Sequence, residues 1–281
     1  MRNVLFALAV LVAAPGVSAQ TILPPALGAQ GQTISPPAFS TQPSSLEFFS
    51  RFDSAISIER FSAAEDERFV WSGIIGVDVD VMDYGLGRTA IVANYEVVMG
   101  REFRPFDPNQ GNYILEASTS ARTGAFELAA VFHHVSRHLS DRPKRRSVDW
   151  NMVGGRMSGD LQRGRASLQG RADIRGVIRR GLVDYRWEVD TEVAARVSLR
   201  PRLALIARSG VRVLGVTGEA DRGTQYGYRG EGGLSFEGRG ATVDLFIAAE
   251  RRIDPYQLEL STATWLTTGF RIAGIGPSRA P

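Results

Sequence analysis

The sequence predicts an all-β fold, a closed antiparallel transmembrane β-barrel of about twelve strands. Three observations predict it: an N-terminal export signal, long segments in which apolar and polar residues alternate, and turn residues between those segments. A strand that spans the bacterial outer membrane needs about ten residues and is followed by a turn. About twelve such strands fit into residues 51–272, which we take as the barrel.

The first residues are typical of a secretory signal. Met1–Asn3 carries a positive charge, Val4–Ala14 is apolar, and Ala14–Ala19 ends in the small-x-small pattern that signal peptidase cleaves. We therefore expect residues 1–19 to be a Sec-type signal peptide and the protein to reach the outer membrane. Residues 20–50, rich in Pro, Gln and Ser, predict a disordered or extended leader, and residues 273–281 a short tail.

Two segments alternate with particular clarity. In 163–176 and in 183–197, charged or polar residues occupy one parity and apolar or small residues the other. Because successive side chains of a strand point to opposite faces, each strand has one charged and one apolar face. We expect the apolar face to contact lipid and the charged face to line the lumen. There, arginines would pair with carboxylates, with Arg171, Arg175, Arg186 and Arg196 opposite Asp184, Glu188, Asp190 and Glu192.

Further strands follow from weaker alternation bounded by Gly, Pro and Asp. They are expected at 54–61, 70–82, 88–103, 112–122, 125–138, 147–160, 202–214, 226–237, 241–251 and 257–270. Aromatic residues that we expect in the interfacial girdles are Trp71, Tyr95, Tyr113, Trp150, Tyr185, Trp187, Tyr226, Tyr228 and Phe270. The alternative fold is a periplasmic β-sandwich or a lipocalin-like barrel.

The composition excludes several classes of site. The chain has no cysteine, which rules out a disulfide scaffold, a thiolate zinc site and a cysteine nucleophile. Its net charge of +3 is too small to predict a nucleic-acid partner. Three histidines leave little room for a multi-histidine metal centre.

All three histidines lie within six residues, at His133, His134 and His138. In the strand expected at 125–138, His134, Ser136 and His138 share the lipid-facing parity. A histidine and a serine two residues apart on a strand have Cβ atoms about 7 Å apart, so an imidazole nitrogen can approach the hydroxyl. Serine becomes a nucleophile when an imidazole takes its proton and a third polar group orients that imidazole.

This block resembles the outer-membrane phospholipases of the A type, which carry a His-x-Ser pair on the outer wall of a twelve-stranded barrel. An asparagine in a Ser-x-x-Trp-Asn-like stretch of the next strand orients their histidine. Here the matching residues are His134-Val135-Ser136 and Ser147–Asn151. The resemblance implies that Ser136 is the nucleophile, His134 the base and Asn151 the orienting group. The lipid A deacylases also use a His-x-Ser pair on a barrel exterior.

The same resemblance implies cleavage of an acyl ester in phospholipid or lipopolysaccharide, a role for Ca²⁺, and a homodimer as well as a monomer. The sequence departs from these families at Arg137, where they usually have asparagine, and in the basic linker 139–146. Within that linker, 141–146 is either a site of attraction to lipopolysaccharide phosphates or a solvated turn. A narrow pore is possible for a barrel of this size, but a wide one is not expected.

A second resemblance is to a family of uncharacterised outer-membrane barrels with a His-x-Ser-x-His-x-x-Asp block. The matching residues are His134, Ser136, His138 and Asp141. This family brings no activity, so the alternative is a non-catalytic barrel in which the histidines form a polar collar at the membrane interface.

The orientation of Asn151 stays open at this point. Trp150 and Met152 look lipid-facing, which would turn Asn151 inward, whereas Arg156, Ser158 and Asp160 imply the opposite phase.

Overall fold

The computed structural model describes residues 26–28, 32–34, 46–62, 66–139, 148–256 and 259–274. The expected signal peptide at 1–19 and Asp141 of the basic linker lie outside the described residues.

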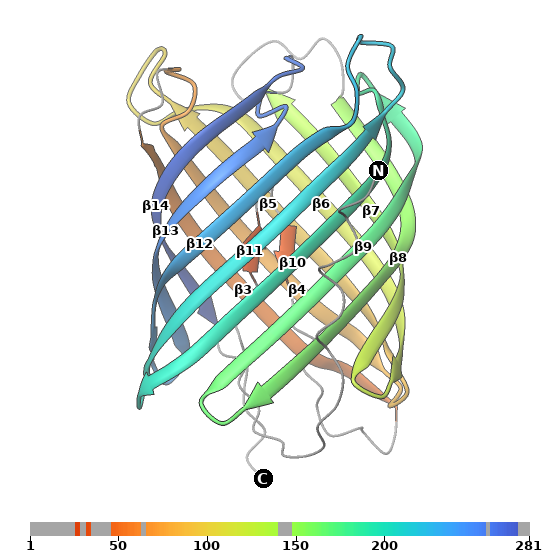
Figure 1. Ribbon diagram of the computed structural model, residues 1–281, viewed down its shortest axis with the longest axis vertical. Coiled ribbons are helices and arrows are strands. Elements are labelled where there is room, and N and C mark those ends of the chain that lie inside the picture. Colours follow the sequence, from red (N-terminus) through yellow and green to blue (C-terminus); the bar gives the residue numbers. More distant parts are fainter. Residues whose placement is uncertain are drawn as a thin grey trace, which may run out of the picture.

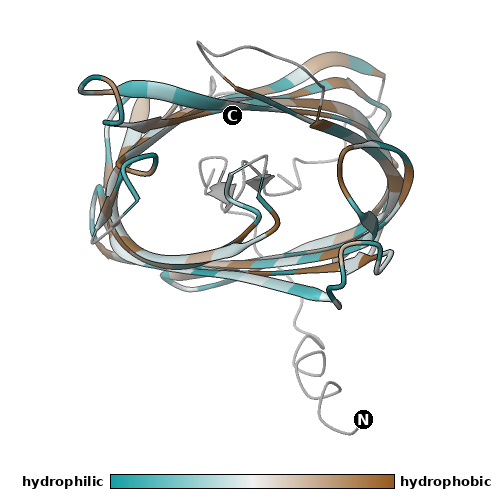
Figure 2. Cartoon of the chain, turned by 90° about the horizontal axis from the view of Figure 1, so that it is seen from above, coloured by the Kyte–Doolittle hydropathy of each residue, from teal (hydrophilic) through white to brown (hydrophobic). Residues whose placement is uncertain are grey.

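Twelve antiparallel strands close into one barrel (Figure 1). They are β3 (Glu47–Ser62), β4 (Trp71–Asp83), β5 (Arg88–Gly100), β6 (Asp107–Thr123), β7 (Phe126–Leu139), β8 (Val148–Arg163), β9 (Ala166–Gly181), β10 (Tyr185–Arg200), β11 (Leu203–Val216), β12 (Gln225–Glu237), β13 (Ala241–Ile253) and β14 (Thr262–Gly274). The pairing of β14 with β3 closes the ring, which is oval when seen from above (Figure 2). Two short strands, β1 (Ala26–Gly28) and β2 (Gln32–Ile34), pair separately. The predicted fold class and strand number are confirmed.

No helix in the described part of the chain is long and apolar enough to cross a membrane.

Several strand boundaries differ from the expected ones. The largest difference is at β3, which begins at Glu47, inside the segment predicted as leader, rather than at 54. β6 begins at Asp107 rather than near 112, because part of the segment between the strands expected at 88–103 and 112–122 joins the ladder, where Pro108 pairs with Met99 next to a register irregularity. β9 begins at Ala166 rather than 163 and continues to Gly181. The reason is the two-residue turn at 164–165, in which Gly164 adopts a positive φ of 59° that glycine accommodates without strain.

The two faces of the barrel differ as predicted. The outer face exposes large apolar side chains, among them Ile56, Ile75, Leu115, Phe132, Ile174, Leu205, Ile247 and Leu266. The inner face carries buried ion pairs, including those of Arg88 with Asp80, Arg156 with Glu116, Arg175 with Glu188, Arg229 with Glu59, Arg252 with Glu96 and Arg271 with Glu231. A closed ladder of this kind leaves no backbone edge unpaired and presents apolar side chains to lipid, so the chain forms an outer-membrane type of barrel.

The interior also contains an apolar layer. Near one end, Ile114, Val135, Val148, Trp150, Met152, Tyr185, Leu214 and Ile253 form a buried cluster. A second cluster near the same end consists of Phe61, Phe69, Val98, Tyr256 and Trp265. The expectation that Trp150 and Tyr185 belong to the interfacial girdle is therefore wrong. At this level of the barrel both faces are apolar, so alternation alone cannot distinguish lipid from lumen.

Some expected lumen pairs are replaced by others. Arg186 is exposed and does not line the lumen, which corrects the expectation for that residue. Asp184 pairs with Arg222 and Asp190 with Arg212. Pairing thus follows neighbouring strands and loops that sequence parity does not identify.

The two ends of the barrel have different connections. At the end where β3 begins and β14 finishes, the strands are joined by two to four residues, and at the opposite end by three to eight. Figure 1 shows the longer connections at the top. Outer-membrane barrels have short periplasmic turns and longer extracellular loops. The long-loop end is accordingly assigned to the cell exterior.

At the long-loop end, Arg222 of the β11–β12 connection contacts both the β9–β10 and the β13–β14 connections. Its guanidinium donates hydrogen bonds to Asp184, before β10, and to Asp254, after β13. The hydroxyl of Tyr185 donates to Asp254 at 2.6 Å. Tyr185 also belongs to the apolar cluster, so these contacts join the connections at this end to that cluster.

The Asp184–Arg222 contact predicts a pH-dependent part of the stability. Hydrogen bonds from Arg222 lower the pKa of Asp184 from its ordinary value. A carboxylate with a lowered folded-state pKa stabilises the fold above its unfolded pKa, and this contribution is lost as the pH falls through the lowered value. The free energy of unfolding, obtained from urea titration, should therefore differ between wild type and Arg222→Ala by about 1 kcal/mol from about pH 8 to 5, and this difference should shrink below about pH 4. A difference that stays constant down to about pH 2 would contradict the role of Asp184.

Breaking a buried ion pair in the lumen should cost much more. Arg175 is fully buried and donates to Glu188, which is equally buried. Arg175→Met leaves that carboxylate without its shortest contact, so the free energy of unfolding should fall by about 3–5 kcal/mol. Urea titration in lipid vesicles measures this, with Arg163→Met as the matched control because Arg163 is exposed at the end of β8. Equal shifts in the two variants would show that lumen pairing does not stabilise the barrel.

Candidate functional site

The His134, Ser136 and His138 side chains lie on the outer face of β7, near the long-loop end. They are half-buried, and they alternate with the buried His133, Val135 and Arg137. The shared outer face follows from the period of two that the sequence shows. The strand ends at Leu139, so the three side chains occupy its outermost part. This places a serine between two histidines on the outer wall, at the long-loop end of the barrel.

Two short contacts define the geometry of the site. Ser136 Oγ lies 2.8 Å from Nε2 of His138. Nδ1 of His134 lies 2.6 Å from Oδ1 of Asn151. The structure thus brings His134 and Asn151 together in the way that an orienting group requires, while the serine hydroxyl contacts the other histidine.

Asn151 faces outward because β8 keeps one phase throughout. Val148, Trp150 and Met152 are buried inside the barrel, and Asn151 is the cross-strand partner of His134. The interpretation of Trp150 and Met152 as lipid-facing is therefore wrong. The opposite phase, which Arg156 and Ser158 indicate, applies to the whole strand. The physical reason is the apolar layer, which accepts Trp150 on the lumen side.

Neighbouring strands place two further side chains beside the serine. Tyr113 of β6 and Asp149 of β8 are its direct cross-strand partners. The Tyr113 ring meets the His138 ring edge to face at 5.3 Å and lies 4.7 Å from Tyr95. Ser136 is thus flanked by an aromatic pair on one side and a carboxylate on the other.

Asp149 is a further residue of the site that the sequence alone does not indicate. The available signal was its parity, since it lies two residues before Asn151 on the same strand and shares its outer face. That signal becomes informative only when the register of β7 against β8 places Asp149 opposite Ser136.

Two other candidates have different positions. Arg137 points into the barrel, where it donates to the carbonyl of Asp254 at 2.6 Å and lies over the Trp150 ring. It therefore anchors β7 to the loop that follows β13. His133 is also internal, with Nδ1 2.9 Å from a Glu116 oxygen. Neither side chain reaches the outer face on which Ser136 lies.

The resemblance to phospholipases implies Ca²⁺, which prefers about six to eight oxygen ligands. Beside Ser136, Asp149 supplies one carboxylate. Within the described ranges no group of three or more His, Asp or Glu side chains is placed to hold a metal ion. The described residues beside Ser136 therefore do not by themselves make a calcium site.

Chemically, the arrangement can activate an alcohol. A hydroxyl in contact with an imidazole can lose its proton to that ring as it attacks a carbonyl carbon. A second imidazole, held by an amide oxygen, is available on the same face two residues away. The group lies on the outer wall of the barrel, in the last part of β7 before the long-loop end.

No protein-family model and no curated protein matches the chain. Among solved structures, LpxR from Salmonella typhimurium is similar, with 8% sequence identity and a TM-score of 0.47 over 79% of this chain and 99% of that chain. The outer membrane phospholipase A from Escherichia coli has 10% identity and a TM-score of 0.49, covering 84% and 94% of the two chains. OmpT, an outer membrane protein of Vibrio cholerae, has 8% identity and a TM-score of 0.41, covering 82% and 98%. At these identities the similarity concerns the barrel fold alone.

Proposed function

We propose that this outer-membrane barrel is an interfacial serine hydrolase that cleaves acyl esters of lipids in the outer leaflet. The observation that carries the proposal is the outward row on β7 and β8, in which Ser136 contacts an imidazole and His134 is held by Asn151. A polar collar without catalytic function does not require a serine hydroxyl, an imidazole and an orienting amide to meet on one face.

In the proposed reaction, Ser136 Oγ attacks the ester carbonyl carbon and its proton passes to His134. The tetrahedral intermediate collapses, the alcohol leaves with the proton from the imidazole, and the acyl group stays on Ser136. Water, activated by the same base, then releases the fatty acid and restores the serine.

Ser136 Oγ contacts His138 in the structure, so the reaction as proposed includes a rotation of Ser136 about χ1. A side chain has three staggered positions, and the two histidines flank the serine at equal distances along the strand. We propose His134 as the base because Asn151 fixes the orientation of its ring. His138 would hold the serine hydroxyl until substrate binds.

The test is fatty-acid release by the refolded barrel in mixed micelles of phospholipid or lipopolysaccharide, with and without calcium. A sulfonyl fluoride should stop the release and leave one covalent adduct, located on Ser136 by mass spectrometry. If the folded barrel releases no fatty acid from either lipid and forms no adduct, the hydrolase proposal fails and the non-catalytic barrel remains.

A further inference from the structure

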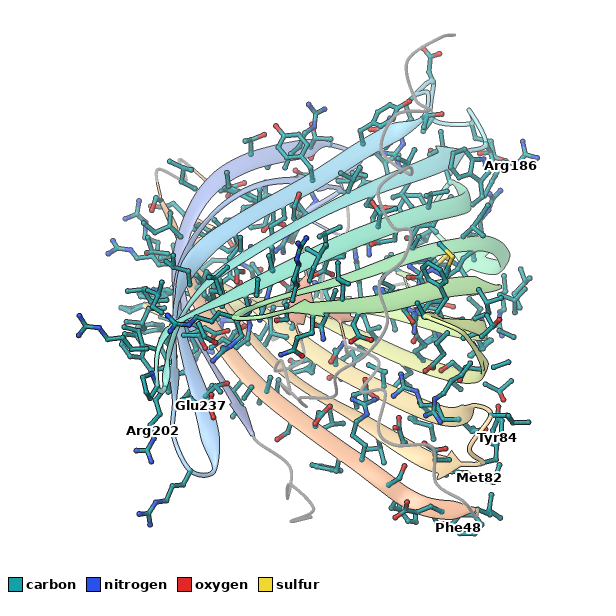
Figure 3. All side chains as sticks on the ribbon, turned by 60° about the horizontal axis from the view of Figure 1, so that its bottom comes forward. Phe48, Met82, Tyr84, Arg186, Arg202 and Glu237 are labelled. Carbon is teal, nitrogen blue, oxygen red and sulfur yellow. The ribbon has the colours of Figure 1, made fainter. Side chains whose placement is uncertain are left out.

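Two outward arginines lie beside the site on the next two strands. Arg179 of β9 is the cross-strand partner of Asn151, which in turn pairs with His134. Arg186 of β10 is exposed, and Figure 3 shows it extending away from the barrel. Within the described ranges, neither arginine forms an ion pair with a carboxylate. Among these described residues, Asp149, which lies on the same outer face, is not paired with either of them.

Both arginines owe their outward direction to irregularities in the ladder. On β9, Asp173, Arg175 and Val177 point inward, so regular alternation would turn Arg179 inward too. Instead, Asn151 pairs with Arg179 and Met152 with Val177, which leaves Ile178 without a partner on β8. This bulge shifts the phase by one residue and turns Arg179 outward.

The same device operates on the neighbouring strand. Arg186 has the parity of the inward-facing Glu188. Tyr185 and Trp187 pair with Val216 and Gly215, so Arg186 is left without a partner on β11. Two adjacent strands thus each carry a bulge that removes an arginine from the lumen. Bulges often re-aim a side chain next to a functional site.

The position of these guanidinium groups predicts the chemistry of their ligand. A cation without a carboxylate partner at the level of lipid head groups attracts anionic lipid. A guanidinium matches the geometry of phosphate through paired N–H donors. Trp187 is exposed on the same outer face, and its ring packs against Gly215. A Cβ atom at position 215 would lie only 2.1 Å from the Trp187 ring, so this packing requires glycine there.

The distances suit one lipid molecule. Two strand spacings separate β7 from β9, so the Arg179 backbone lies about 10 Å from that of His134. An arginine side chain extends over much of that distance. A head-group phosphate bound at Arg179 would therefore leave the acyl ester of the same lipid within reach of the serine row.

We infer that Arg179 and Arg186 bind the head-group phosphate of an outer-leaflet lipid and so select phosphate-bearing lipids as substrates. The selection of substrates rests on the proposed function, whereas the binding of phosphate does not require hydrolysis.

Binding is best measured on the full-length refolded barrel with Ser136→Ala, so that no lipid is consumed. The probes are detergent micelles doped with phosphatidylglycerol, with bisphosphorylated lipid A, or with diacylglycerol, which has no phosphate. We expect the two phosphate-bearing lipids to bind more tightly than diacylglycerol. Arg179→Gln and Arg186→Gln should each weaken their binding by about fivefold. Arg202→Gln is the matched control, because Arg202 is exposed at the opposite end of the barrel (Figure 3).

Competition by inorganic phosphate distinguishes a lipid head group from free phosphate as the ligand. Inorganic phosphate should compete only weakly if a lipid head group is the ligand, and strong competition would identify a free-phosphate site instead. Equal affinities for phosphatidylglycerol, lipid A and diacylglycerol, or equal effects of Arg179→Gln and Arg202→Gln, would overturn the inference. Phosphate-dependent binding in a barrel that releases no fatty acid would support the phosphate site and reject the hydrolase. Hydrolysis with phosphate-independent binding would do the reverse.

Discussion

Replacing Ser136 with alanine should reduce fatty-acid release by about 10³-fold or more. Without Oγ there is no atom to carry the acyl group, so the covalent route through an acyl-enzyme is lost. The change should hardly affect folding, because the side chain lies on the outer face and its hydroxyl makes one contact, with His138. We expect a loss of at most about 1 kcal/mol in the free energy of unfolding.

The assay compares initial rates of fatty-acid release by wild type and Ser136→Ala. Both proteins are first shown to be folded by their resistance to unfolding in unheated SDS. Ser209→Ala is the matched control, since Ser209 is exposed on β11, far from the histidines in the strand order. If Ser136→Ala retained wild-type release, the serine would not be the nucleophile, and the contacts on β7 would be structural.

The barrel is predictable from this sequence because its determinants are local. Alternation in segments such as 163–176 follows from the geometry of a strand that separates lipid from a polar lumen, and turn residues mark the ends. The outward face shared by His134, Ser136 and His138 follows from the same parity. Strand limits were less predictable, because Asp107 and Pro108 join the ladder through an irregularity in register.

The rest of the site depends on contacts between strands. Trp150 suggested a lipid-facing phase because the apolar layer inside the barrel gives both faces the same character at that level. Arg186 suggested a lumen residue because a bulge has no sequence signature strong enough to shift the parity. The position of Asp149 opposite Ser136, and the choice of His138 as the partner of the hydroxyl, are set by cross-strand register, which one sequence does not reveal.

Replacing each of the two histidines with alanine in turn should distinguish their roles. We expect His134→Ala to lower the turnover rate by about 10²–10⁴-fold, the range that a positioned general base contributes. His138→Ala should lower it by about tenfold or less, because the hydroxyl is then free to turn toward His134. Asn151→Ala should fall between them, since the His134 ring loses the contact at 2.6 Å that fixes its orientation.

Turnover measured at saturating lipid in mixed micelles compares the three variants without a contribution from binding. A larger loss in His138→Ala than in His134→Ala would reverse the assignment, so that the 2.8 Å contact of the structure would be the catalytic one. The effect of Asn151→Ala would then be small, because Asn151 contacts only the histidine that is not the base. The order of the three rates therefore identifies which imidazole takes the proton, and it does so independently of whether phosphate recognition by Arg179 is correct.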